Sequence, residues 1–189
     1  MADQILTLVQ IEDLFRSVTM QILGIPEKNI QNKAINQEKV RIAWATGGAP
    51  SWKITEDVTF IKITPADDPI IQQRDVVYTG DDAHNSNRIV SYTRNHLVDW
   101  TIYGPACYEN ADAIRNGLYQ PEMKELLSDN NIALITNIPG PRRVPELFDG
   151  RWWQRCDLTA QFNEAVIRYG TIKLIETVAI GSDIIITKG

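Results

Sequence analysis

Acidic and basic side chains alternate between residues 142 and 164, and this is where the sequence offers most chemistry. The acids are Glu146, Asp149, Asp157 and Glu164, and the bases are Arg142, Arg143, Arg151 and Arg155. Paired carboxylates serve acid–base catalysis or hold hard cations, so Asp149, Asp157 and Glu164 could form a metal-dependent hydrolase site. Ion pairing within or between subunits explains the same alternation more simply.

Other residue types that carry chemistry are few. The two histidines, His84 and His96, have no metal-ligand spacing to a cysteine or carboxylate, so each is predicted to be an ordinary surface or strand-end histidine. Cys107 and Cys156 fall on apolar stripes, which predicts buried, reduced thiols. Nucleophile-elbow, dinucleotide-binding and Walker motifs are absent. The sequence therefore predicts no enzyme, no cofactor and no metal site.

Bulk composition limits the class of protein further. The chain has 189 residues, of which 43% are hydrophobic and 23% charged, as in an ordinary folded domain, and we expect one domain over residues 1–189. No segment is long and apolar enough to span a membrane, so we expect folding in the cytoplasm of the producing cell. A net charge of -5 does not attract nucleic acid.

The central elements follow from periodicity. Residues 98–103 alternate as a half-buried strand ended by Gly104 and Pro105. Apolar spacings of four and three then predict a helix over residues 107–118, and a shorter helix begins at Pro121. A strand over residues 132–136 and a stiff loop over 138–150 follow. Residues 151–163 read as one long strand, with Trp152, Cys156 and Phe162 on its apolar face and Trp153, Arg155 and Asp157 on its polar face.

The flanking elements are also readable. Thr7 and Gln10 form a capping box that starts a helix over residues 8–23, and strands are expected over 40–44 and 57–64. The excursion from residue 65 to 95 reads as a loop or hairpin arm, with 74–78 pairing with 88–92. A C-terminal hairpin is expected over 171–187, and its apolar run Ile184, Ile185 and Ile186 must be covered by the core or a neighbour.

These elements predict an α+β fold. We expect an antiparallel β-sheet with two or three helices packed on one face, a projecting hairpin arm and a C-terminal β-hairpin.

Several short motifs occur in a fixed order along the chain. They are YGP at 103–105, the helix with Ala111 and Ile114-Arg115, PRRVPEL at 141–147, and W-x-R-x-D-L through Trp153, Arg155, Asp157 and Leu158. Their order and spacing resemble the neck terminator, or tail terminator, proteins of long-tailed bacteriophages. The first helix and GGAP at 47–50, within a surface turn expected over residues 47–53, also fit, and the match covers about two thirds of the chain.

The resemblance implies a structural virion protein of the tail and neck, present in the host cytoplasm during assembly. It implies a homo-oligomeric ring, a hexamer, that caps the tail tube, ends its polymerisation and joins it to head–tail connector or adaptor proteins. The sheath protein is a further partner, and DNA passes through the channel without specific binding. A head-completion or sheath-adaptor protein of the same neck region is the structural alternative. Interface candidates are Arg142, Arg143, Trp153, Arg155, Asp157, Ile184, Ile185 and Ile186.

Overall fold

The computed structural model describes residues 2–25, 39–43, 52–80, 84–174, 177–180 and 184–187, the last two ranges as backbone only. The chain forms two compact units. Unit 1 comprises residues 1–5, 69–93 and 165–189, and unit 2 comprises residues 6–68 and 94–164. The long strands β4 (Asn85–Tyr103) and β9 (Arg155–Lys173) each contribute residues to both units. The single domain over residues 1–189 stays a prediction.

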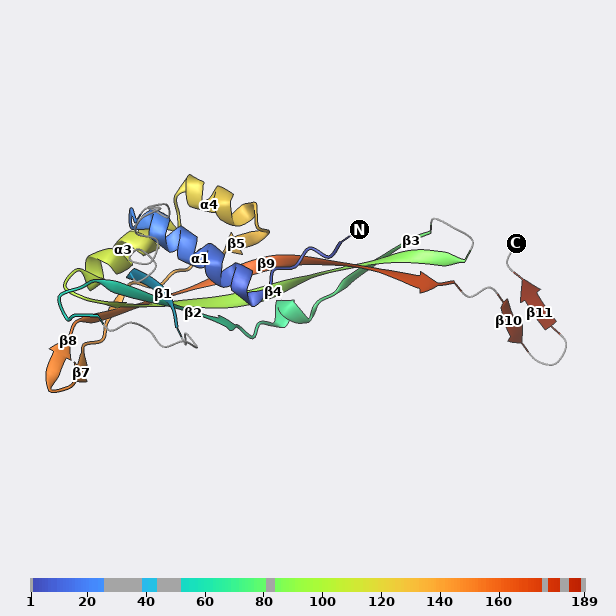
Figure 1. Ribbon diagram of the computed structural model, residues 1–189. Coiled ribbons are helices and arrows are strands. Elements are labelled where there is room, and N and C mark those ends of the chain that lie inside the picture. The colour runs from blue at the N-terminus through green and yellow to red at the C-terminus, as the bar shows by residue number, and fades with distance from the viewer. Residues whose placement is uncertain are drawn as a thin grey trace. The chain divides into compact units, whose positions relative to one another are not determined.

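The described residues of unit 2 form three helices, which Figure 1 shows on the same side of its strands. Helix α1 begins at the predicted capping box, where Thr7 and Gln10 bond reciprocally, and ends before Gly24, which has a φ of 64°. Pro121 occupies the first turn of α4 as expected. The predicted α+β fold is confirmed. The helices are α1 (Leu8–Ile22), α3 (Cys107–Gly117) and α4 (Pro121–Ser128).

The core of unit 2 forms between these helices and the sheet. The largest fully buried side chain is Trp100, which packs edge-on against Phe15 and Phe162 with ring centroids 6.4 and 6.5 Å away. Its indole Nε1 donates to Thr19 Oγ1 at 2.9 Å, so the one polar atom of the ring is satisfied. Leu8, on the first turn of α1, is 57% exposed and lies outside this core.

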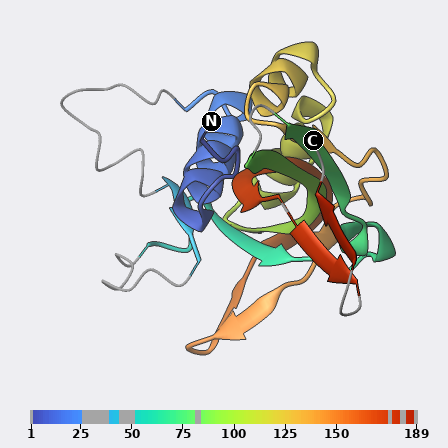
Figure 2. The same ribbon diagram turned by 90° about the vertical axis from the view of Figure 1, so that its right-hand side faces the viewer.

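The strands of the sheet in unit 2 follow the order β1-β2-β4-β9-β5, and β6 also pairs with β9. Strand β2 pairs antiparallel with β4, but β1 pairs parallel with β2, so the sheet is mixed rather than purely antiparallel. A view turned by 90° separates the strands from the helices that cover them (Figure 2). The bounds are β1 (Val40–Ile42), β2 (Val58–Pro65), β5 (Ile132–Leu134) and β6 (Arg142–Arg143).

Gly104 explains why a glycine follows the strand that ends at Tyr103. Its φ is 114°, and a Cβ added there would lie 2.3 Å from the Asp57 carboxylate and 2.7 Å from backbone atoms of Glu56 and Asp57. The same carboxylate accepts from the Ala106 backbone N–H at 2.9 Å, next to the start of α3. Gly104 therefore lets β2 and the start of α3 approach each other closely.

Unit 1 contains β3 (Asp75–Gly80), the 3-10 helix η1 (Pro69–Gln72) and the hairpin of β10 (Thr177–Ile180) and β11 (Ile184–Thr187). Strand β3 pairs antiparallel with β4, placing Tyr78 opposite Arg88. Two predicted boundaries are wrong. Residues 88–92 and 98–103 belong to one continuous strand, and residues 170–173 belong to β9 rather than to the C-terminal hairpin. Whether residues 65–95 project as an arm stays a prediction.

The predicted stiff loop over 138–150 and the unbroken strand over 151–163 are also wrong. The loop contains β6 and β7 (Glu146–Phe148), and β7 pairs with β8 (Arg151–Trp153) as a separate two-stranded hairpin. Gln154 separates β8 from β9, and its carbonyl accepts from the Gly104 N–H at 3.2 Å. Trp152 consequently leaves the apolar face on which the sequence placed it.

Candidate interaction site

The β7–β8 hairpin is built by a tight turn at Asp149 and Gly150. Both residues have left-handed backbone conformations, with φ values of 47° and 69°. Two successive residues of this kind form the turn that matches the twist of a two-residue hairpin. The turn sets Leu147 opposite Trp152 and Glu146 opposite Trp153. The hairpin therefore presents two different faces.

The tip and one face of the hairpin are apolar and exposed. Leu147 is 58% exposed, Phe148 64% and Trp152 66%. The two strands have three residues each and pair with no other strand in the described part of the chain. Such a small hairpin is marginal alone, and exposed aromatic anchors of this kind are typical of protein–protein contacts.

A charged network ties the other face of the hairpin to β4 and β9. The Glu146 carboxylate accepts from Tyr103 Oη at 2.7 Å and from Arg155 Nη1 at 3.2 Å. Arg155 also donates to both oxygens of Asp157, at 2.8 and 3.0 Å. Bidentate pairing of this kind fixes the guanidinium plane, so Arg155 holds the base of the hairpin to β9.

These contacts shift the pKa values in consistent directions. Burial and the hydrogen bond to Glu146 raise the pKa of Tyr103 to about 12. The hydrogen bond from Tyr103, together with that from Arg155, holds the pKa of Glu146 below its usual value. Hydrogen bonds to Asp157 raise the pKa of Arg155 further. At neutral pH the network consists of a neutral phenol, two carboxylates and one guanidinium.

An aromatic hollow of about 410 Å³ lies beside the hairpin. The aromatic side chains that line it form a cluster, in which the rings of Trp52 and Trp153 pack edge-on with centroids 5.9 Å apart. The indole Nε1 atoms of both are buried without a hydrogen-bond partner among the described residues. Unpaired buried donors cost free energy, so this cluster is less well satisfied than the core around Trp100. The hollow is lined by Trp52, Tyr103, Glu146, Phe148 and Trp153.

The remaining predicted interface residues lie in two other places. Arg142 and Arg143 are exposed on β6, opposite Asp157 and Cys156 of β9. Ile184, Ile185 and Ile186 belong to β11, where the structure describes the backbone pairing with β10 and not the side chains. Structure thus brings Trp153, Arg155 and Asp157 together at the hairpin base, and the role of all eight residues stays a prediction.

The three carboxylates of the hydrolase alternative are held in different surroundings. Asp149 forms the hairpin turn, Asp157 is paired with Arg155, and Glu164 is buried with Arg94 and His96. Within the described residues no group of three His, Cys, Asp or Glu side chains could hold a metal ion. Asp157 therefore has the arginine partner that the ion-pair interpretation requires.

Glu164 is the most deeply buried charged residue of unit 2, with 1% of its surface exposed. Its carboxylate accepts hydrogen bonds from the Arg94 guanidinium and from the Leu6 backbone N–H, the latter at 3.0 Å. It also forms a hydrogen bond with His96 Nε2 at 2.8 Å. Although burial opposes ionisation, these hydrogen bonds hold its pKa below the usual value. The prediction that His96 is a surface or strand-end residue is wrong, because β4 begins at Asn85 and buries His96 in its interior.

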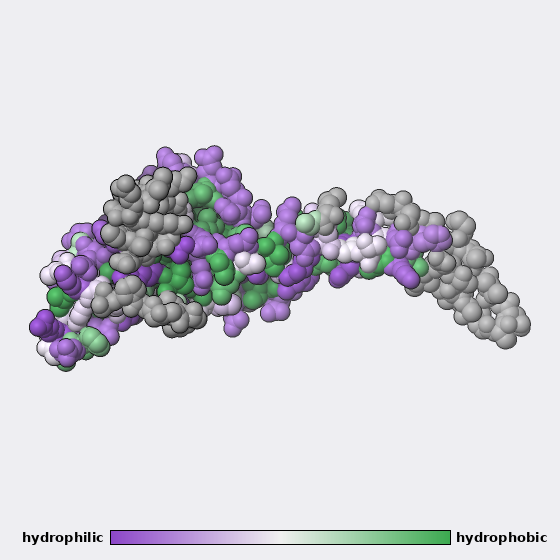
Figure 3. Space-filling view, viewed as in Figure 1, coloured by the Kyte–Doolittle hydropathy of each residue, from purple (hydrophilic) through white to green (hydrophobic). Residues whose placement is uncertain are grey.

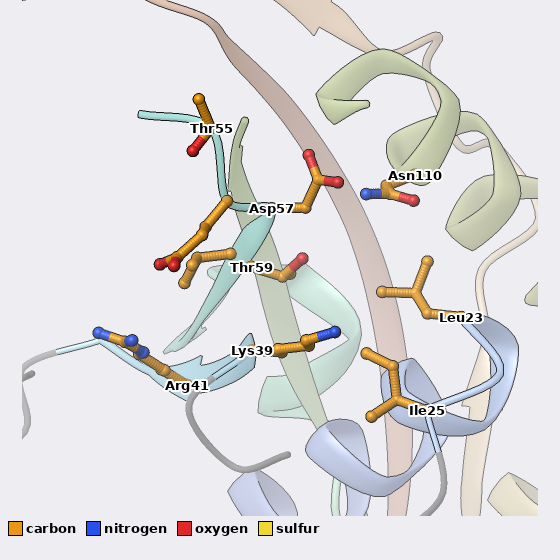
Figure 4. A pocket seen from close by; sticks show the side chains of 10 residues that line it. Leu23, Ile25, Lys39, Arg41, Thr55, Asp57, Thr59 and Asn110 are labelled. Atoms are coloured by element: carbon orange, nitrogen blue, oxygen red, sulfur yellow. The ribbon is translucent and has the colours of Figure 1, made fainter. Parts of the chain in front are cut away.

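A second hollow of about 510 Å³ lies where β1, β2 and α3 meet (Figure 4). In that view the Lys39 ammonium lies toward Leu23, while Arg41 points away from it. The Asp57 carboxylate on its wall already accepts from the Ala106 N–H, so it serves the turn before α3. This hollow lacks the convergent set of polar groups that an active site uses.

The prediction that both cysteines are buried, reduced thiols is confirmed. Cys107 and Cys156 are free and buried, with 3% and 0% of their surfaces exposed. Burial raises the pKa of both thiols, which keeps them protonated and weakly reactive.

Sequence reasoning missed the residues that dominate this site. Phe148 and Trp152 sit on the exposed hairpin, and Trp52 was read as part of a surface turn. A signal was present in the dipeptide Asp149-Gly150, which between apolar residues is a strong hairpin indicator. The rest of the predicted turn, residues 47–51, lies outside the described residues.

An α+β subunit with an exposed aromatic hairpin on a rigid base has the features of an assembly protein, and comparison with known families agrees. The model of the family described as phage neck terminator protein matches residues 9–188. The chain belongs to this family, so it is a structural protein of the phage tail and neck that interacts with other tail and head–tail proteins. No curated protein matches the chain. Among the described residues, no helix has the length and apolar character needed to cross a membrane.

Proposed function

We propose that the protein forms a ring, a hexamer, that caps the tail tube, ends its polymerisation and joins it to the head-side connector. The observation that carries this proposal is the match to the neck terminator family over nearly the whole chain. Head–tail connector or adaptor proteins and the sheath protein are the further partners. The ring leaves a channel through which DNA passes.

The β7–β8 hairpin supplies a suitable contact surface for such an assembly. Aromatic side chains that are exposed in the free subunit and become buried on assembly contribute most to binding energy. Trp152 and Phe148 have this exposure, while Trp153, Arg155 and Asp157 hold the hairpin in place. Arg142 and Arg143, exposed on β6, are the charged contacts of the same interface.

DNA needs to move through the channel without being held. The net charge of -5 supports this, because tight non-specific binding requires many basic contacts to phosphate. A lumen lined mainly by lysine and arginine would contradict this part of the proposal.

Assembly on purified tail tubes tests the proposed function. We expect light scattering and negative-stain images to show open rings of about six subunits, free or on tube ends. Trp152→Ser should weaken tube capping, whereas Val9→Ser, which removes an equally exposed apolar side chain from α1, should not. A monomer that fails to cap tubes, at every concentration, contradicts the proposal. Binding to the portal complex but not to tubes favours a head-completion protein instead.

A further inference from the structure

The described residues of unit 1 form no core of their own. Among its described residues only Ser86 and Val166 are buried, whereas every residue of β3 is exposed. The exposed residues include three large apolar ones, Val76 at 38%, Val77 at 52% and Tyr78 at 58%. Figure 3 shows hydrophobic residues at the surface of this unit beside hydrophilic ones. A sheet that exposes such side chains normally meets a partner.

The first free edge of this sheet is β3. Strand β3 pairs with β4 on one side, and no other described strand pairs with it. Natural proteins protect free edges with lysine, proline or a bulge. The sequence of β3, Asp-Val-Val-Tyr-Thr-Gly, has neither lysine nor proline, and its register with β4 is continuous. Its backbone is therefore open to another strand.

The second free edge belongs to β9. Ile167 exchanges backbone hydrogen bonds with Gln4, and the Tyr169 N–H donates to Asp3, so odd-numbered residues face away from β4. The Leu174 N–H bonds the His84 carbonyl on the opposite side, as this alternation requires. Beyond Tyr169 the outward groups of Thr171 and Lys173 meet no described strand.

Each edge carries one charge among the described residues, and the two charges are opposite. Asp75 begins β3, and Lys173 ends β9. Arg168, just before the β9 edge, is already paired with Asp3. Asp75 and Lys173 have no ion-pair partner among the described residues. One chain thus carries both halves of a complementary contact, which favours a second copy of itself as the occupant.

We propose that β3 of one subunit pairs with the edge of β9, residues 169–173, in the next subunit. This inference rests on the proposed ring, because joining two different edges is a head-to-tail contact that closes when the rotation between copies closes. Strands β3 and β9 both run antiparallel to β4, so they share a direction. When β3 of one copy continues the sheet beyond the β9 edge of the next, this shared direction makes the new junction a parallel strand pair between neighbours.

Cysteine cross-linking of the full chain tests this contact. Val77→Cys and Thr171→Cys place one thiol on each edge, and a bifunctional maleimide spans small differences in register. The native thiols are buried and do not compete. We expect the double variant to form covalent ladders up to ring size, and a mixture of the two single variants to form dimers. Each single variant alone should remain monomeric on a denaturing gel.

The outcomes separate this inference from the proposed function. Rings that assemble without cross-links overturn the β3–β9 contact and leave the ring intact. Cross-links in the Val77→Cys single variant would show that β3 pairs with β3 of another copy. Cross-links only to the tube protein would show that the tube protein binds this edge. Either outcome overturns the inference. Failure to form rings or cap tubes overturns the proposed function and this contact with it.

An edge-blocking variant gives a second, independent measurement. Val77→Lys places a charge on the exposed strand, and Val77→Thr is the matched control that keeps its β-branched shape. We expect the lysine variant to assemble at a concentration at least about tenfold higher, with the circular dichroism melt of the free subunit unchanged. Equal assembly of the lysine and threonine variants contradicts the contact.

Discussion

Units 1 and 2 are stabilised in different ways. Unit 2 buries three aromatic side chains that pack together, Trp100, Phe15 and Phe162. Its buried carboxylate, Glu164, accepts hydrogen bonds from three donors. Unit 1 consists of paired strands whose side chains remain at the surface, with only Ser86 and Val166 buried among its described residues. Strands pair through backbone hydrogen bonds in both units, so the units differ in how much side-chain surface their described residues bury.

This difference separates folding from assembly. Hydrophobic burial is the main favourable contribution to folding, and unit 2 obtains it within one chain. Unit 1 can obtain it only by covering Val76, Val77 and Tyr78 with another molecule. Substitutions in unit 2 should therefore change the stability of the free subunit, and substitutions in unit 1 should change what it binds.

The largest effect is expected in the core of unit 2. Phe162→Ala removes a fully buried ring that lies 4.6 Å from Phe15, centroid to centroid. The free energy of unfolding should fall by about 3–5 kcal/mol, because a cavity replaces the ring. Urea denaturation followed by circular dichroism measures it. Phe162→Leu, which fills most of the space, is the control, and an equal loss in both variants would contradict the packing argument.

The next effect concerns the buried charge. Glu164→Gln should lower the free energy of unfolding at pH 7 by about 2–3 kcal/mol, because Arg94 and His96 lose a buried anionic partner. The folded-state pKa of Glu164 lies below its unfolded value. Its contribution is therefore present above about pH 4.5 and is lost as the pH falls through the folded-state pKa.

Denaturation curves at several pH values measure this dependence. Below about pH 4.5 the wild type should lose stability more steeply than Glu164→Gln, so that the two curves approach each other in acid. Glu125→Gln, at an exposed position of α4, is the matched control. Parallel curves for wild type and Glu164→Gln would show that the buried network does not stabilise the fold.

A smaller effect is expected at the base of the hairpin. Tyr103→Phe removes the hydrogen bond to Glu146 and should cost about 1 kcal/mol at pH 7. The folded pKa of Tyr103 is raised to about 12, so its contribution is complete below pH 10 and disappears as the pH rises toward 12. Thermal melts at pH 7 and at about pH 12 measure both predictions. Tyr108→Phe on α3 is the control, and an equal effect there would remove the special role of Tyr103.

The smallest effect on the free subunit is expected in unit 1. Tyr78→Ser removes an exposed side chain from β3 and should change the free energy of unfolding by less than about 0.5 kcal/mol. Ring assembly should weaken in the same variant. A loss of stability comparable to that of Phe162→Ala would mean that unit 1 contributes to folding after all, and the contrast between the units would disappear.

Local signals predicted much of unit 2. The capping box at Thr7 and Gln10, the alternation that buries Trp100 and the apolar spacing that buries Ile114 were all visible in the sequence. Each signal depends on residues that are close in the chain, and each is strong enough to survive in the fold.

Features that depend on distant residues were not predictable in the same way. His96 and Glu164 are 68 positions apart, so nothing local shows that they bond. The interruption at Gln154 separates β8 from β9. The alternating pattern of residues 151–163 does not reveal it, so the sequence indicates one strand and puts Trp152 on the wrong face. The aromatic hollow around Trp52 is missing from the sequence interpretation for the same reason.

Exposure of β3 also has a consequence for how assembly can be followed in time. Segments with little buried surface open locally at low cost, and proteases cleave them first. Arg74 precedes β3, Arg88 lies opposite Tyr78 on β4, and both are exposed, which makes them accessible to trypsin. Binding of a partner would lower their cleavage rate by mass action. The rate of tryptic cleavage at these two arginines therefore measures, over time, the fraction of subunits that has not yet been assembled into tails.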